Sequence, residues 1–169
     1  MAAGATYFPI ATTTTTGSAT TVTFSTIPAT YTDLVLISNA GAVVNGSDLR
    51  MRINGDTGNN YSDTYLWGSG STAGSARASS QSRFSLTYYG TLPSGSTTRG
   101  TIITQIMNYS NTTTYKTCLT RANNAASGTD AIVHLWRNTN AITSISLLEL
   151  GLSGFTDGST FTLYGIEYA

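Results

Sequence analysis

Short stretches in which hydrophobic and polar residues alternate recur along the chain. From Leu49 to Asn54, Leu, Met and Ile alternate with Arg, Arg and Asn. Side chains of a β-strand point to opposite faces in turn, so this pattern predicts a strand with one buried face and one exposed face. Val22 and Phe24 alternate with threonine and serine in the same way.

Other stretches are apolar at consecutive positions, as in Leu34–Ile37 and Ile102-Ile103. They predict strands that are covered on both faces. Pairs such as Asn54-Gly55 and Asp157-Gly158 lie between the stretches and tolerate the positive φ angles of turns. The expected strands lie near residues 5–12, 20–26, 33–38, 48–54, 61–67, 83–89, 100–108, 114–121, 131–137, 142–149 and 159–168.

No segment has the period of an amphipathic helix of ten or more residues. The sequence therefore predicts an all-β fold, a β-sandwich or jelly roll of about ten strands with no significant helix. Two stretches rich in turn residues, Gly68–Gln81 and Pro93–Arg99, are expected to form long surface loops. We expect residues 19–169 to form a single β-jelly-roll domain.

Residues 1–18 are uncharged, and the first charged residue of the chain is Asp33. Two interpretations stay open for this segment: the first strand of the domain's own sheet, or an arm that adds to the sheet edge of a neighbouring molecule. In the second case Tyr7, Phe8 and Ile10 would make the assembly contact.

The chain is poor in charge. Only 9% of its 169 residues are charged, and eight basic residues balance eight acidic ones. In typical soluble domains about 25% of the residues are charged. A surface without net charge favours association with other proteins. We therefore expect a protein that spends its life assembled with other proteins. The scattered arginines argue against nucleic-acid binding.

Neither a membrane segment nor a secretion signal is expected. No run reaches the roughly 18 apolar residues that span a bilayer, and residues 1–20 lack the basic and apolar regions of a signal peptide.

Cys118 is the only cysteine, which excludes an intrachain disulfide. We expect its side chain to be buried and to pack as a small hydrophobic residue.

Candidate catalytic residues are few. The single histidine, His134, lies in a segment of alternating hydrophobic and polar residues that predicts a strand. A catalytic Ser-His-Asp triad would need a serine and an acid beside it. The favoured interpretation is a packed histidine whose ring nitrogens are hydrogen-bonded within the fold. Glu149 and Glu167 are the only glutamates, and a glycan hydrolase needs two carboxyl groups facing each other across the bond that breaks. We therefore predict a protein that is not an enzyme, with a glycan hydrolase as the less favoured alternative.

Binding residues are also ambiguous. The oxygen-rich segment Asn54–Asp63 could hold calcium, but a turn that hydrogen-bonds its own backbone explains it without an ion. We predict no metal and no cofactor. Aromatic side chains could stack on sugar rings or pack within the fold. These aromatic residues are Tyr61, Tyr65, Trp67, Tyr88, Tyr89 and Trp136.

Four phrases of the sequence taken together resemble a known family: Phe24–Leu36, Leu49–Ser62, Leu135–Ile145 and Gly158–Ile166. The chain resembles the jelly-roll-like virion structural domains of tailed bacteriophages, and the resemblance runs from about residue 5 to the end. It implies a structural role and gives no catalytic residue to carry over.

The printed sequence shows no shaft or coiled coil before the domain, which favours a small accessory protein. The resemblance then implies a capsid decoration (cement) protein on the outer surface of the virion. Its expected partners are the major capsid protein or other virion proteins and further copies of itself, as a homotrimer. The alternative is a tail-fibre or tail-tip protein that binds a glycan of the host surface.

Overall fold

The computed structural model describes residues 6–17, 19–95 and 97–167. Within them the chain forms twelve strands, and no helix is present. The strands are β1 (Tyr7–Thr14), β2 (Thr21–Phe24), β3 (Asp33–Ala40), β4 (Leu49–Ile53), β5 (Tyr61–Gly68), β6 (Ala73–Gln81), β7 (Phe84–Ser85), β8 (Gly100–Ile106), β9 (Lys116–Asn124), β10 (Gly128–Trp136), β11 (Ile145–Glu149) and β12 (Thr160–Ile166). In the described part of the chain, no helix has the length and apolar character needed to cross a membrane.

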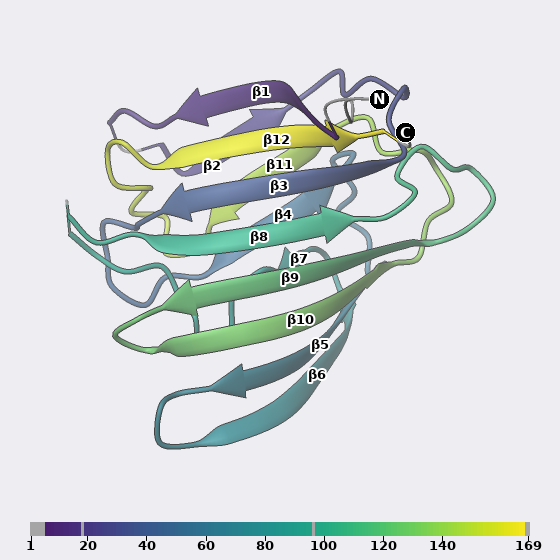
Figure 1. Cartoon of the computed structure of the whole chain (residues 1–169). Coiled ribbons are helices and arrows are strands. Elements are labelled where there is room, and N and C mark those ends of the chain that lie inside the picture. The colour runs from purple at the N-terminus through teal and green to yellow at the C-terminus, as the bar shows by residue number, and fades with distance from the viewer. Residues whose placement is uncertain (1–5, 18, 96, 168–169) are drawn as a thin grey trace, which may run out of the picture.

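The strands form two antiparallel sheets that pack as a β-sandwich, so the predicted all-β, jelly-roll-like fold is confirmed. The large sheet has the order β1-β12-β3-β8-β9-β10-β5-β6, and the small sheet has the order β2-β11-β4-β7. Figure 1 shows the large sheet as one curved layer with the small sheet behind it, while β5 and β6 extend below the small sheet.

The core lies between the two sheets, where the alternating residues of each strand meet. On β4, Leu49, Met51 and Ile53 are fully buried, as the alternation of that segment predicts. Two large aromatic residues, Tyr61 and Trp136, are also fully buried, and their polar atoms have partners. The Tyr61 hydroxyl donates to the Ile53 carbonyl at 3.2 Å, and the Trp136 indole donates to the Asp56 carboxylate at 2.7 Å. These bonds allow large aromatic side chains to be buried at little polar cost.

The expected loop over Gly68–Gln81 is wrong, because β6 occupies Ala73–Gln81 and forms a hairpin with β5. Its inward positions carry glycine and alanine, and its outward positions carry serine and arginine, so no apolar alternation marks the strand. The small residues are needed there: a Cβ atom on Gly74 would lie 2.6 Å from the ring of Trp67. The expected loop over Pro93–Arg99 has no strand in its described residues.

β1 lies at one edge of the large sheet and pairs with β12, with Tyr7 opposite Ile166. The described part of segment 1–18 therefore includes a strand of the domain's own sheet. Residues 1–5 and 18, which also belong to the predicted arm, lie outside the described residues. A bulge between Pro9 and Ala11 interrupts the pairing of β1, and Pro9 lacks an N–H group. Both features reduce the capacity of an edge to recruit another strand.

Gly165 on β12 lies directly under the ring of Tyr31, which in turn stacks on Phe8 at 5.9 Å. A Cβ atom at Gly165 would lie 2.2 Å from the Tyr31 ring. We predict that Gly165→Ala lowers the free energy of unfolding by about 1–3 kcal/mol, because the ring must move out of its packed position.

Urea unfolding of Gly165→Ala and of Gly68→Ala measures this effect. Gly68→Ala is the matched control, because the nearest atom to its new Cβ is Thr129 Cγ2 at 4.0 Å. Equal stabilities of the two variants would contradict the prediction.

Candidate functional site

A chain of hydrogen bonds crosses the large sheet inside the sandwich. Nδ1 of His134 on β10 lies 2.6 Å from the Asp63 carboxylate on β5, and Nε2 lies 2.8 Å from the Thr120 hydroxyl on β9. The Thr120 hydroxyl lies 2.9 Å from that of Thr104 on β8. The four side chains are at most 1% exposed. The predicted role of His134, a packed histidine with both ring nitrogens satisfied, matches this geometry.

The second carboxylate oxygen of Asp63 connects the two sheets. It accepts hydrogen bonds from the Tyr65 hydroxyl at 3.0 Å and from the backbone N–H of Ser85 at 3.1 Å. Ser85 belongs to β7 of the small sheet, and its neighbour Phe84 packs on the His134 ring with 4.8 Å between centroids. Asp63 and His134 therefore join β5, β9 and β10 to the opposite layer.

An acid, a histidine and a hydroxyl in a row have the order of a hydrolase triad. Here the hydroxyl of Thr120 is fully buried and already bonded to Thr104. A substrate carbonyl would have to reach it through the packed core. The arrangement therefore links strands and offers no surface for chemistry.

Asp130 on β10 holds the loop that follows β7. Its carboxylate accepts the backbone N–H groups of Tyr88, Tyr89 and Gly90 at 2.7–2.9 Å. Three N–H groups converging on one carboxylate fix the loop backbone. The segment predicted as a strand over residues 83–89 is therefore a strand only at Phe84–Ser85 and continues as this loop.

The loop places two tyrosines in an aromatic cluster. Tyr88 stacks on Tyr65 at 4.7 Å, and Tyr89 stacks on Trp67 at 4.0 Å with 12° between the rings. With Tyr89 stacked on it and Gly74 against its ring, Trp67 acts as a packing residue. Of the six aromatic residues considered for sugar binding, Tyr61, Tyr65 and Trp136 are buried, and Tyr88 and Tyr89 are partly exposed.

The calcium candidate Asn54–Asp63 forms a turn and the start of β5, and the side-chain oxygens of Asn54, Asp56 and Asp63 already have hydrogen-bond partners. The Asp56 carboxylate accepts bonds from the Asn60 amide, the Trp136 indole and the Gly58 N–H. Burial acts to raise the pKa of Asp56, but these hydrogen bonds and the positive charge of Arg52 together outweigh it, and the pKa is lowered. In the described residues, no three side chains of the His, Cys, Asp and Glu types gather as a metal site.

The two glutamates lie at opposite ends of the sandwich. Glu149 is 1% exposed, and its carboxylate accepts bonds from the Ser47 hydroxyl and from the backbone N–H groups of Gly151 and Gly154. Glu167 is exposed and follows the far end of β12. The structure does not bring them together as the hydrolase interpretation requires.

The single thiol is buried as well. Burial raises the pKa of Cys118, and the negative charge of Asp63 adds to the effect. A thiol held protonated in this way is a poor nucleophile, which agrees with the predicted role of a small hydrophobic residue.

The outer face of the large sheet exposes aliphatic side chains. Leu66 on β5, Val133 on β10 and Leu119 on β9 are 61%, 55% and 39% exposed. Val133 lies directly opposite Leu119, and Leu66 lies opposite Ala131. Across β5, β8, β9 and β10, which are described in full, Arg121 is the only outward-facing side chain with a formal charge. We call the surface around Leu66, Leu119 and Val133 the outer face.

The predicted assembly residues lie on β1. Tyr7 is half-exposed beside Tyr164. Phe8 stacks on Tyr31, and Ile10 packs against the core of its own domain. A contact with another chain through these residues stays a prediction, and Phe8 and Ile10 already have partners within the domain.

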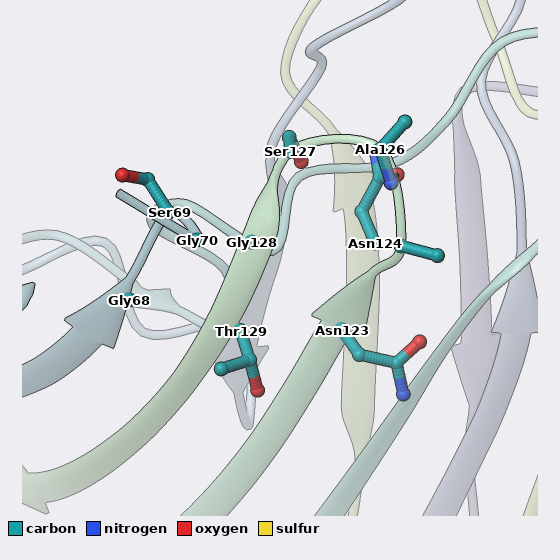
Figure 2. Close-up of a pocket in the computed structure, with 10 residues that line it drawn as sticks. Gly68, Ser69, Gly70, Asn123, Asn124, Ala126, Ser127, Gly128 and Thr129 are labelled. Atoms are coloured by element: carbon teal, nitrogen blue, oxygen red, sulfur yellow. Dashed lines mark hydrogen bonds between the residues drawn. The ribbon is translucent and has the colours of Figure 1, made fainter. Parts of the chain in front are cut away.

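A hollow of about 400 Å³ lies between the β5–β6 turn and the β9–β10 turn. Figure 2 shows that glycine, serine and asparagine line it, with Ser69 on one turn and Ser127 on the other. Several of these polar groups bond to the protein itself: the Asn124 amide donates to the Thr91 carbonyl, and the Ser127 hydroxyl donates to the Tyr89 carbonyl. The lining residues include no acid, base or thiol, so this hollow has no group for acid–base chemistry.

Two comparisons with known proteins gave no match: no family model fits the chain, and no curated protein resembles it significantly. The resemblance to phage virion domains therefore stays a prediction.

We predict that Asp63→Ala lowers the free energy of unfolding by about 3–5 kcal/mol. The change leaves His134, Tyr65 and the Ser85 N–H without their acceptor in the core, and breaking a buried pair by removing one partner is costly.

Asp157→Ala is the control for losing a carboxylate, because Asp157 is exposed in a turn; its effect should stay within about 0.5 kcal/mol. Urea unfolding measures both. If Asp63→Ala is as stable as the control, Asp63 does not have the linking role described above.

Proposed function

We propose that this protein is a non-enzymatic structural component of a bacteriophage particle, a capsid decoration protein that binds the assembled shell as a homotrimer. The observation that carries the proposal is the outer face, where aliphatic side chains lie exposed on a rigid sheet with little charge. Contiguous exposed apolar surface of this kind indicates a protein contact.

The outer face suits binding to another folded protein. Strands β5, β10 and β9 are hydrogen-bonded to one another, so their outward side chains are held in fixed positions. A preorganised surface loses little conformational entropy on binding. Anything that binds only the assembled shell stabilises the shell by mass action, which is the action expected of a decoration protein.

Charge supports a protein partner. The formal net charge is zero, so copies of the chain can crowd on a shell without repelling one another. A nucleic-acid partner would require a broad basic patch. On the outer side of the large sheet, Arg121 and Arg77 are separated by β10 and β5. Of the arginines that lie near one another, Arg50, Arg52 and Arg83, Arg50 is paired with Asp48.

Polar and ionisable groups of the interior support a role without catalysis. His134, Asp63 and Glu149 are each buried and fully engaged with neighbours of the fold. Their bonds hold strands and loops in place, which is what a structural protein requires.

The second candidate is a tail-fibre or tail-tip protein that binds a host glycan. The observation that favours it is the pair of partly exposed tyrosines, Tyr88 and Tyr89, on the loop that Asp130 fixes. Aromatic rings on a fixed loop can stack on sugars. Much of this aromatic surface is already used in stacking on Tyr65 and Trp67, so we rank the candidate second.

We predict that Val133→Asp weakens binding to the shell at least about 10-fold, because the contact would bury an unpaired charge. Purified protein is added to particles that lack it, and the bound fraction is measured by sedimentation across a concentration series. The wild-type protein should bind and should raise the temperature at which the shell opens.

Thr21→Asp is the matched control. Thr21 is an exposed strand residue on the outside of the small sheet, on the opposite side of the sandwich, so its variant should bind like the wild type. A wild-type protein that neither binds nor stabilises particles would rule out the decoration function. Equal binding by Val133→Asp and Thr21→Asp would rule out the outer face as the contact.

A further inference from the structure

Three of the eight basic residues of the chain gather on the outside of the small sheet. Two of them, Arg50 and Arg52, lie on β4, where they alternate with three fully buried residues. Because side chains alternate between the two faces of a strand, both arginines point away from the core. In Figure 1, β4 and its neighbour β7 lie behind the large sheet.

Strand pairing brings the third arginine, Arg83, to the same place. β4 and β7 are antiparallel, with Met51 opposite Phe84, and both of these side chains are fully buried. The next residues along the two segments, Arg52 and Arg83, therefore lie side by side on the outer side. Burial lowers the pKa of Arg83, and the positive charges of Arg50 and Arg52 lower it further.

The three arginines have few acids around them. One ion pair involves them within the described residues: Arg50 binds Asp48, with 2.6 Å between the nitrogen and the oxygen. The Asp56 carboxylate lies within electrostatic range of Arg52, but it is engaged by the hydrogen bonds of its own turn and forms no ion pair. Two of the three positive charges are thus left without an ion-pair partner.

The arginines also have unused hydrogen-bond donors. The Nε–H groups of Arg50 and Arg52 are buried, and they have no acceptor in the part of the chain that the structure describes. Buried donors nearly always have a partner, because an unpaired donor loses its bonds to water without replacement. Like charges on neighbouring strands also repel one another. Such an arrangement is unfavourable in the free protein and becomes favourable when an anion supplies the missing acceptors.

We propose that Arg50, Arg52 and Arg83 form a binding site for a tetrahedral dianion, a phosphate or sulfate group that is either free or an ester on a larger molecule. Guanidinium groups are planar forks that bind oxyanions through paired hydrogen bonds. A phosphate monoester carries a charge of about −1.5 to −2 at neutral pH, which matches the two unpaired positive charges. The site lies on the opposite side of the sandwich from the outer face, and it does not depend on the proposed capsid function.

Titration of sodium sulfate into the ¹⁵N-labelled protein at neutral pH tests the proposal, with sodium chloride keeping the ionic strength constant. We expect saturable shifts in the NMR signals of the backbone amides of residues 49–53 and 82–85, with a dissociation constant of about 10 mM or lower. Inorganic phosphate and glycerol phosphate should shift the same signals. Sodium acetate should bind at least about 10-fold more weakly, because it carries a single charge.

The test variant is Arg83→Gln, and the matched control is Arg77→Gln. Each variant removes one positive charge, but Arg77 is exposed on β6 and faces outward from the large sheet. Arg83→Gln should weaken sulfate binding at least about 10-fold. Arg77→Gln should leave the dissociation constant within about twofold of the wild-type value, because a distant exposed charge is screened by salt.

Thermal unfolding gives a second readout. Without sulfate, Arg83→Gln should melt at the wild-type temperature or higher, because a repulsion between like charges is removed. Sulfate stabilises many proteins by exclusion from their surface, so the increase in melting temperature is compared between variants. The increase should be larger for the wild type and Arg77→Gln than for Arg83→Gln, because bound anion adds to the stability of the folded state.

Three results would overturn the proposal: no saturable shifts with sulfate or phosphate, equal weakening of binding by Arg83→Gln and Arg77→Gln, or acetate that binds as tightly as sulfate. Within a positive result, tighter binding of glycerol phosphate than of inorganic phosphate would assign an ester as the ligand, and weaker binding would assign the free anion. No particle enters these experiments, so their outcome is independent of the test of the decoration function.

Discussion

The rest of the sandwich depends on the buried contact between Asp63 and His134. One carboxylate oxygen lies 2.6 Å from the histidine ring, and the other accepts bonds from Tyr65 and from Ser85 of the opposite sheet. A polar pair in a core is tolerated only if every donor and acceptor is satisfied, and a satisfied pair favours one arrangement over its alternatives. Here it fixes β5 against β10 and the large sheet against β7, so a shift in register would leave buried groups unpaired.

This interior sets the position of the surfaces. With the register fixed, Leu66, Leu119 and Val133 face outward together on one side of the large sheet. Two further carboxylates act in the same way on loops: Asp130 fixes the segment of Tyr88 and Tyr89, and Glu149 joins Ser47 to the loop of Gly151 and Gly154. Asp63, Asp130 and Glu149 thus serve as internal fasteners. The formal net charge of the chain is zero, and a surface without net charge suits a protein that works in an assembly.

The sequence was informative where the signal is local. The alternation on β4 placed Leu49, Met51 and Ile53 in the core, and the structure confirms it. The β6 strand was predicted as a loop because its inward positions are glycine and alanine, which the ring of Trp67 requires. The partners of His134 could not be found, because Asp63 lies 71 residues away and the register of distant strands is not encoded in a short pattern.

The copy number of this chain in purified particles tests whether it is a shell-binding structural protein. Quantitative mass spectrometry gives it relative to the major capsid protein. For a decoration protein we expect a ratio near one to one, or one trimer for every few capsid subunits. A ratio of a few per cent or less would contradict it and would favour a tail component that binds a host glycan.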